Sequence, residues 1–123
     1  MVRHPEDFHQ VYAKAFSAGD LDSIMALYES TAKLIPQPGG PAVTGQAIRD
    51  ALQGFLALKP ILKAETESVV KADDIALLRS KWTLTGTGTD GKAVTRSHRG
   101  TEVIRRQADG TWRLIIDHLF GAD

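Results

Sequence analysis

Residues 93–121, AVTRSHRGTEVIRRQADGTWRLIIDHLFG, carry the strongest structural pattern in the chain. They predict two long strands joined by a turn at 108–110, because Asp-Gly between apolar-rich runs is a strong β-hairpin signal. Side chains alternate across a strand, so every second residue of the second arm is expected on one face. That face would carry Trp112, Leu114, Ile116, His118 and Phe120. A histidine among large hydrophobic side chains indicates the wall of a pocket.

Length and composition describe an ordinary globular chain. At 123 residues it fits a single domain spanning residues 1–123. It has 15 basic and 15 acidic side chains, so bulk charge favours neither nucleic acid nor an anionic membrane as a partner. Cysteine is absent, which excludes disulfides, zinc–thiolate sites and a cysteine nucleophile. The first ten residues lack the apolar core of a signal peptide, and we expect a cytoplasmic protein.

Helices are expected first and long strands afterwards. Apolar residues at helical spacing follow Pro5, and Gly19 and Asp20 separate this first helix from the next. The predicted elements are helices at 5–18, 20–28 and 45–58, short strands at 31–35 and 42–44, and long strands at 61–71, 75–87 and in both hairpin arms. This segregation indicates an α+β fold, with the helices against one face of an antiparallel sheet.

Two local phrases carry a resemblance to a known family. The first is Ala18–Tyr28, AGDLDSIMALY, and the second is Val103–His118, VIRRQADGTWRLIIDH. With the order of elements, they make the whole chain resemble the nuclear-transport-factor-2-like superfamily, specifically its SnoaL-like and ketosteroid-isomerase-like small domains. The resemblance implies a cystatin-like cone, in which N-terminal helices pack on a curved antiparallel sheet with an open mouth of ligand size. It also implies a homodimer through the outer face of the sheet.

The same resemblance implies roles for individual residues. Ketosteroid isomerases place an oxyanion-donating tyrosine on the first helix, which matches Tyr12, and a protonated acid at the start of the last hairpin, which matches Glu102. A carboxylic acid kept neutral by an apolar site can donate a hydrogen bond to developing negative charge. The proton-abstracting aspartate of these enzymes matches Pro36, which cannot take up a proton. His98 or His118 is then a candidate base, since imidazole titrates near neutral pH.

These residues lead to two hypotheses of function. The first is an isomerase or cyclase that acts by acid/base catalysis on a compact hydrophobic carbonyl compound. The second is a non-catalytic ligand-binding or dimerisation module of the same fold, with the tyrosine in the core and the acid in a structural salt bridge. No cofactor or metal is expected, because the glycine-rich stretch 85–91 runs into a strand and the histidines lack metal-ligand spacing. The predicted ligand-binding residues are Trp82, Phe16, Phe55, Ile116 and Phe120.

Three further expectations concern single groups and the outer face of the sheet. His4 and His9 are placed beside a flexible start, and Glu102 is expected to be the only acid on its face. The outer face is expected to be too apolar for full exposure, which favours a homodimer. The outward residues are expected to be Thr83, Thr101, Val103, Ile115 and Leu119.

Overall fold

The fold places short helices before and between the strands of one sheet. A computed structural model describes residues 1–123. Its elements in chain order are the 3-10 turn η1 (Pro5–Asp7), α1 (Phe8–Ser17), α2 (Leu21–Met25), β1 (Tyr28–Ile35), α3 (Gln46–Leu56), β2 (Ile61–Ala72), β3 (Ile75–Thr87), β4 (Ala93–Arg106) and β5 (Trp112–His118). None of the helices has the length and apolar character needed to cross a membrane.

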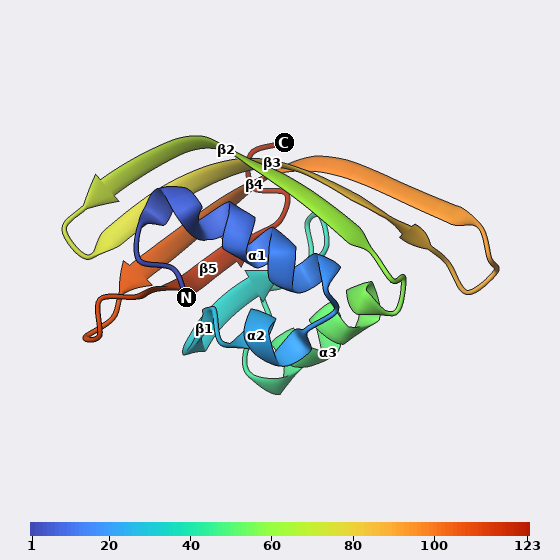
Figure 1. Cartoon of the computed structure of the whole chain (residues 1–123), viewed down its shortest axis with the longest axis horizontal. Helices are drawn as coiled ribbons and strands as arrows, with labels where there is room; N and C mark the ends of the chain where they lie inside the picture. The colour runs from blue at the N-terminus through green and yellow to red at the C-terminus, as the bar shows by residue number, and fades with distance from the viewer.

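The five strands form one curved, open sheet in the order β1-β5-β4-β3-β2. Strands β2 to β5 are an antiparallel meander, and β1 joins the edge parallel to β5. Figure 1 shows the helices gathered on the concave side, with α1 lying along the sheet, while no helix covers the convex side. The predicted α+β fold, with helices packed on one face of a curved antiparallel sheet, is confirmed.

The start of β1 differs from the sequence-based expectation. The second helix was expected to reach Tyr28, but α2 ends at Met25 and the strand begins at Tyr28. Asp20 caps α2 as predicted, because its side chain accepts a hydrogen bond from the backbone of Ser23 at 3.1 Å. Beyond the helix, the Leu114 N–H donates to the carbonyl of Leu27 at 2.7 Å. Pairing with β5 therefore overrides the local helical pattern and places Tyr28 in the sheet.

The core fills the space between the helices and the concave face. It contains 17 buried hydrophobic residues, among them Phe8, Ile48, Leu78 and Trp112. The inward residues of β3 and β4 follow the predicted alternation, so Trp82 is paired with His98 and shares its face. The helices and the inner face of the sheet thus meet through apolar side chains. The buried polar side chains are few, and they are His9, Ser80, Glu102, Thr111 and Asp117.

Strand β5 contains one residue more than its partner can pair. Ile104 is paired with Leu114, whereas Val103 is paired with Ile116, so Ile115 has no partner on β4. An extra unpaired residue in one strand of an antiparallel pair is a β-bulge, and it shifts the alternation of every side chain that follows.

The bulge overturns the predicted orientation of the end of β5. Asp117 points inward and is 3% exposed, whereas Ile116 is 43% exposed on the convex face. His118 shares the outward direction of Ile116, so the expectation that both line the inner face is wrong. Leu119 was expected on the outer face, but it lines the pocket instead.

Candidate functional site

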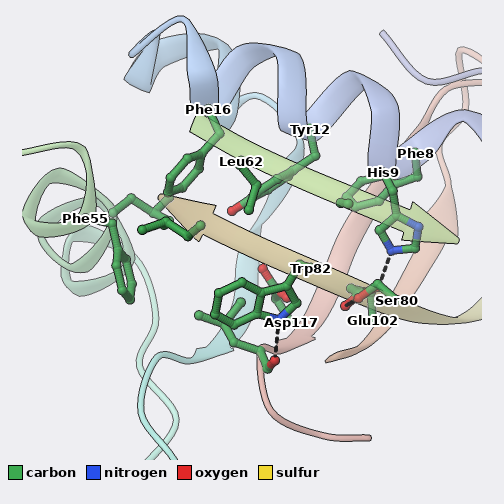
Figure 2. A pocket seen from close by; sticks show the side chains of 14 residues that line it. Phe8, His9, Tyr12, Phe16, Phe55, Leu62, Ser80, Trp82, Glu102 and Asp117 are labelled. Carbon is green, nitrogen blue, oxygen red and sulfur yellow. Dashed lines mark hydrogen bonds and ion pairs between the residues drawn. The ribbon is translucent and has the colours of Figure 1, made fainter. Parts of the chain in front are cut away.

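A pocket opens between α1, α3 and the concave face of the sheet. Its hollow measures about 580 Å³ including the open mouth. Figure 2 shows side chains from α1 pointing across it toward the strands. The apolar lining residues are Phe8, Phe16, Leu52, Phe55, Leu62, Ala64, Trp82, Leu84 and Leu119, and the polar ones are His9, Tyr12, Ser80, Glu102 and Asp117. No lysine or arginine lines the pocket.

A first polar cluster joins α1 to three strands. His9 Nε2 is hydrogen-bonded to Glu102 Oε1, and His9 Nδ1 lies 2.6 Å from Thr66 Oγ1. Ser80 donates from Oγ to the other carboxylate oxygen, Glu102 Oε2, at 2.9 Å. His9 is 4% exposed and Glu102 is 5% exposed. Both nitrogens of the imidazole and both oxygens of the carboxylate therefore have partners within the protein, which fixes their orientation.

Gly100 makes room for this cluster. A Cβ atom at that position would lie 2.6 Å from Glu102 Oε2 and 2.9 Å from Ser80 Oγ. These distances are shorter than any ordinary contact of a methyl group, so a side chain here would displace the carboxylate. The absence of a side chain at Gly100 is thus a requirement of the Ser80–Glu102 hydrogen bond.

A second polar cluster runs from α1 through β1 to β5. The hydroxyl oxygens of Tyr12 and Tyr28 are 2.8 Å apart, and Tyr28 donates to Asp117 Oδ2 at 2.6 Å. Burial, followed by the negative charge of Asp117, raises the pKa of each tyrosine well above its usual value of 10.0. Both phenols are therefore neutral and serve as hydrogen-bond donors and acceptors.

The two buried acids are neighbours on adjacent strands. Glu102 and Asp117 are paired across β4 and β5, so their side chains emerge on the same face. Burial, and then the negative charge of Glu102, raise the pKa of Asp117 to about 7, against the opposing effect of the hydrogen bond from Tyr28. Near neutral pH this pair offers one carboxylate beside one carboxyl group that gains or loses a proton easily.

The predicted site residues divide into two groups. Tyr12 and Glu102 line the pocket, as do the predicted ligand-binding residues Phe16, Phe55 and Trp82. The others, which are His98, His118, Ile116 and Phe120, do not line it. The pocket therefore contains two of the four predicted catalytic residues and three of the five predicted ligand-binding residues.

Neither of the predicted histidines meets Glu102. His98 Nδ1 lies 2.7 Å from Asp123 Oδ2, and its ring packs edge-on against Phe120 with the centroids 4.8 Å apart. His118 Nδ1 accepts a hydrogen bond from the backbone of Phe120 at 3.3 Å. Its side chain lies on the convex face, because it follows the bulge. The imidazole beside Glu102 belongs to His9, so the expectation that His9 flanks a flexible start is wrong.

Three titratable residues of the site were missed in the sequence. His9 precedes Tyr12 by three positions and Phe16 by seven, and this helical spacing was the available signal that His9 faces the core. Tyr28 was hidden by the overextended second helix. Asp117 was hidden by the bulge, for which the residues around Ile115 give no recognisable signal, and the expectation that Glu102 is the only inward acid is therefore wrong.

A curved open sheet with helices on its concave side and a pocket between them defines the class of nuclear-transport-factor-2-like proteins with a cystatin-like fold. Within that class, residues 8–115 match the family described as the SnoaL-like domain. The chain belongs to the SnoaL-like domain family. No curated protein matches the chain.

Solved structures agree with this assignment. A ketosteroid isomerase-like protein from Erwinia carotovora atroseptica is 25% identical, with a TM-score of 0.71 over 89% of this chain and 86% of the other. A nuclear transport factor 2-like superfamily protein from Salmonella enterica serovar Typhimurium is 17% identical, with a TM-score of 0.79 over 96% and 88% of the two chains. A candidate calcium/calmodulin-dependent protein kinase type II association domain from Thiobacillus denitrificans is 21% identical, with a TM-score of 0.78 over 100% and 98%.

Proposed function

We propose that the pocket binds a compact, largely apolar carbonyl compound and moves a proton on it by acid/base catalysis, as an isomerase does. The observation that carries this proposal is the buried pair of Glu102 and Asp117, neighbours on adjacent strands with separate hydrogen-bond partners. Burial and the negative charge of Glu102 raise the pKa of Asp117, and a carboxyl group with a raised pKa beside a second acid is a recurring arrangement in acid/base catalysis. The similar structure from Erwinia, whose name is ketosteroid isomerase-like, supports the same class of reaction.

In this proposal the two acids have different roles. Asp117 in its protonated form donates a hydrogen bond to the carbonyl oxygen of the substrate, and so stabilises the enolate-like charge that develops there. Glu102 removes the proton from the carbon beside the carbonyl and returns it at another carbon, so the carbon–carbon double bond moves and no atom is gained or lost. His9 and Ser80 hold the Glu102 carboxylate in place by their hydrogen bonds. Tyr12 lies at the same pocket as a neutral hydroxyl.

The lining of the pocket also limits the substrate. Rings of Phe8, Phe16, Phe55 and Trp82 favour a flat or cyclic apolar body. Two acids and no lysine or arginine at the pocket oppose a substrate with a carboxylate or phosphate, because a buried anion without a partner is strongly disfavoured. The substrate expected on these grounds carries a carbonyl group and no negative charge.

The test is the conversion of small β,γ-unsaturated cyclic ketones to their conjugated isomers, followed by ultraviolet absorbance. Wild type should accelerate the conversion, and Glu102→Gln should lower kcat by about 100-fold or more, since it removes the proton acceptor. His118→Ala is the matched control, because His118 lies on the far side of the sheet from the pocket. An absence of acceleration by wild type across a panel of neutral enones would overturn the catalytic proposal.

A second candidate function is a non-catalytic dimerisation module, and one surface favours it. Four apolar residues form a stripe across the convex face, each paired with the next on the neighbouring strand. They are Val70, Leu77, Val103 and Ile116, and we call them the convex stripe. Val70, Leu77 and Ile116 are 60%, 41% and 43% exposed. We propose that a second copy of the chain covers the convex stripe in a homodimer.

A further inference from the structure

Tyr12, Tyr28 and Asp117 form a chain of hydrogen bonds, and both ends of this hydrogen-bonded chain face the pocket. Tyr12 and Asp117 line the pocket, whereas Tyr28, which connects them, does not. The two links, at 2.8 Å and 2.6 Å, join α1, β1 and β5. All three side chains are buried, with exposures of 9%, 4% and 3%. Two pocket-lining residues are therefore connected by hydrogen bonds through groups that are buried from bulk water.

The number of protons on the chain decides what it offers to a ligand. When Asp117 is ionised, Tyr28 donates to Asp117 and Tyr12 donates to Tyr28, so both hydroxyl hydrogens are used internally. The linked groups then present only acceptor oxygens to the pocket, those of Tyr12 and of the Asp117 carboxylate. When Asp117 takes up a proton, the three groups carry three hydrogens, and the two internal hydrogen bonds use only two of them. The third hydrogen then points into the pocket from Asp117. If both internal hydrogen bonds reverse their direction, it points into the pocket from Tyr12 instead.

We propose that this proton count selects between two kinds of ligand. With the added proton the chain binds the carbonyl oxygen of a neutral ligand, and without it the chain binds the ammonium group of an amine of similar shape. Tyr28 is the positioning residue of this device, because it makes Tyr12 and Asp117 a single unit. The inference rests on the proposed function in using the same pocket, and it adds hydrophobic amines as a ligand class.

The charges around Asp117 favour an ammonium ligand once the proton is lost. The group that faces Asp117 from β4 is Glu102, and its negative charge raises the pKa of Asp117. From α1 the titratable groups at the pocket are Tyr12 and His9, and His9 is already bonded to Glu102. From β1, Tyr28 faces Asp117 and donates a hydrogen bond to it. The pocket residues from α3, β2 and β3 are uncharged.

No lysine or arginine lines the pocket to offset the two acids, and a ligand cation would lower the cost of ionising both. The aromatic rings of Phe8, Phe16 and Trp82 also line the pocket, and such rings attract ammonium groups that lie over their faces. The pKa of Asp117, raised to about 7 by burial and by Glu102, places the change between the two ligand classes close to neutral pH.

The experiment compares two compounds with the same carbon skeleton, acetophenone and 1-phenylethylamine. Their dissociation constants for the full chain are measured by isothermal titration calorimetry at pH 6 and pH 8, where the amine stays protonated. Acetophenone should bind about tenfold more weakly at pH 8, and the amine should bind about tenfold more tightly, because the binding-competent fraction changes by that factor around pH 7. The ratio of the two affinities is the readout, and it should change by about 100-fold.

Two variants separate this device from other causes of pH dependence. Asp117→Asn should remove the pH dependence of the ratio of the two affinities. If His9 were the source of that pH dependence, it would persist in this variant. Tyr28→Phe keeps the ring but removes the link, so it should move the crossover of the two affinities to higher pH, since the hydrogen bond from Tyr28 lowers the pKa of Asp117. A merely structural role of Tyr28 would leave the crossover unchanged.

The outcomes distinguish the two proposals. If acetophenone binds equally well at both pH values, or the amine does not bind at pH 8, the selection by proton count is wrong while the carbonyl-binding pocket stands. If neither compound binds at any pH, both proposals fall. Circular dichroism checks that each variant is folded, and Asp117→Asn alone decides the result where Tyr28→Phe does not fold.

Discussion

Replacing Asp117 by asparagine should remove a loss of stability that wild type shows as pH rises. An aspartate has an ordinary pKa of 3.8, and the fold raises that of Asp117 to about 7 by burying it beside Glu102. Between these pH values the folded chain keeps the proton while the unfolded chain has released it. The unfolded state then binds fewer protons, so the free energy of unfolding falls as pH rises and levels off above the folded-state pKa.

The size of this effect follows from the shift. Raising a pKa from 3.8 to about 7 is a change of about three units, and each unit corresponds to about 1.4 kcal/mol. The buried carboxyl group therefore costs ~4 kcal/mol above pH 7 relative to pH 4 and below. That is a large share of the ~5–15 kcal/mol by which ordinary domains are stable. Asparagine keeps the shape, and its side-chain oxygen can still accept the hydrogen bond of Tyr28, without carrying a titrating proton.

The assay is urea unfolding at pH 5, 6, 7 and 8, followed by circular dichroism and by the fluorescence of the two tryptophans. The free energy of unfolding of Asp117→Asn minus that of wild type should rise by about 1.4 kcal/mol per pH unit up to pH 7 and then flatten. Asp50→Asn is the control, since it removes an exposed carboxylate on α3. A difference that does not change with pH would refute the claim that the fold holds a proton on Asp117.

The other predictions concern the first polar cluster and the convex stripe. Gly100→Ala should displace the carboxylate of Glu102 and the hydroxyl of Ser80, and cost ~1–3 kcal/mol in urea unfolding, and an unchanged midpoint would contradict that close approach. His9→Ala should cost ~3 kcal/mol at pH 7 because it leaves the buried acid without its main partner, and a loss below about 0.5 kcal/mol would show that the pair contributes nothing. Leu77→Glu should turn a dimer into a monomer in light scattering at micromolar concentration, and a wild-type monomer would exclude the dimer.

Much of the fold was predictable because its signals are local and agree with one another. The Asp-Gly turn at 109–110 and the alternation along β3 and β4 fix a hairpin and its faces. That is why Glu102 was correctly placed on the inner face. Tyr12 was assigned from the resemblance to ketosteroid isomerases, and it lies on the buried side of α1. Each of these positions depends on a period that continues without interruption.

The rest of the site depends on features that interrupt a period or bring distant segments together. The bulge at Ile115 reverses the faces of the residues that follow it in β5, and no glycine or proline there indicates it in the sequence. The partner of Glu102 is His9, 93 positions away, and nothing local to either residue identifies the other. Tyr28 became part of the site because β1 pairs with β5, which a helical pattern in the sequence concealed.

The bulge also bears on why the pocket contains two acids. A regular β5 would turn Ile116 inward and Asp117 outward, which would bury an apolar side chain and leave a carboxylate in water. The bulge does the opposite, since it exposes Ile116 and buries Asp117 at a cost of ~4 kcal/mol near neutral pH. Neither result improves the core. Departures from local rules that cost stability tend to lie at functional sites. The proposed function of this SnoaL-like domain therefore centres on the Glu102–Asp117 pair, which the bulge at Ile115 brings to one face of the sheet.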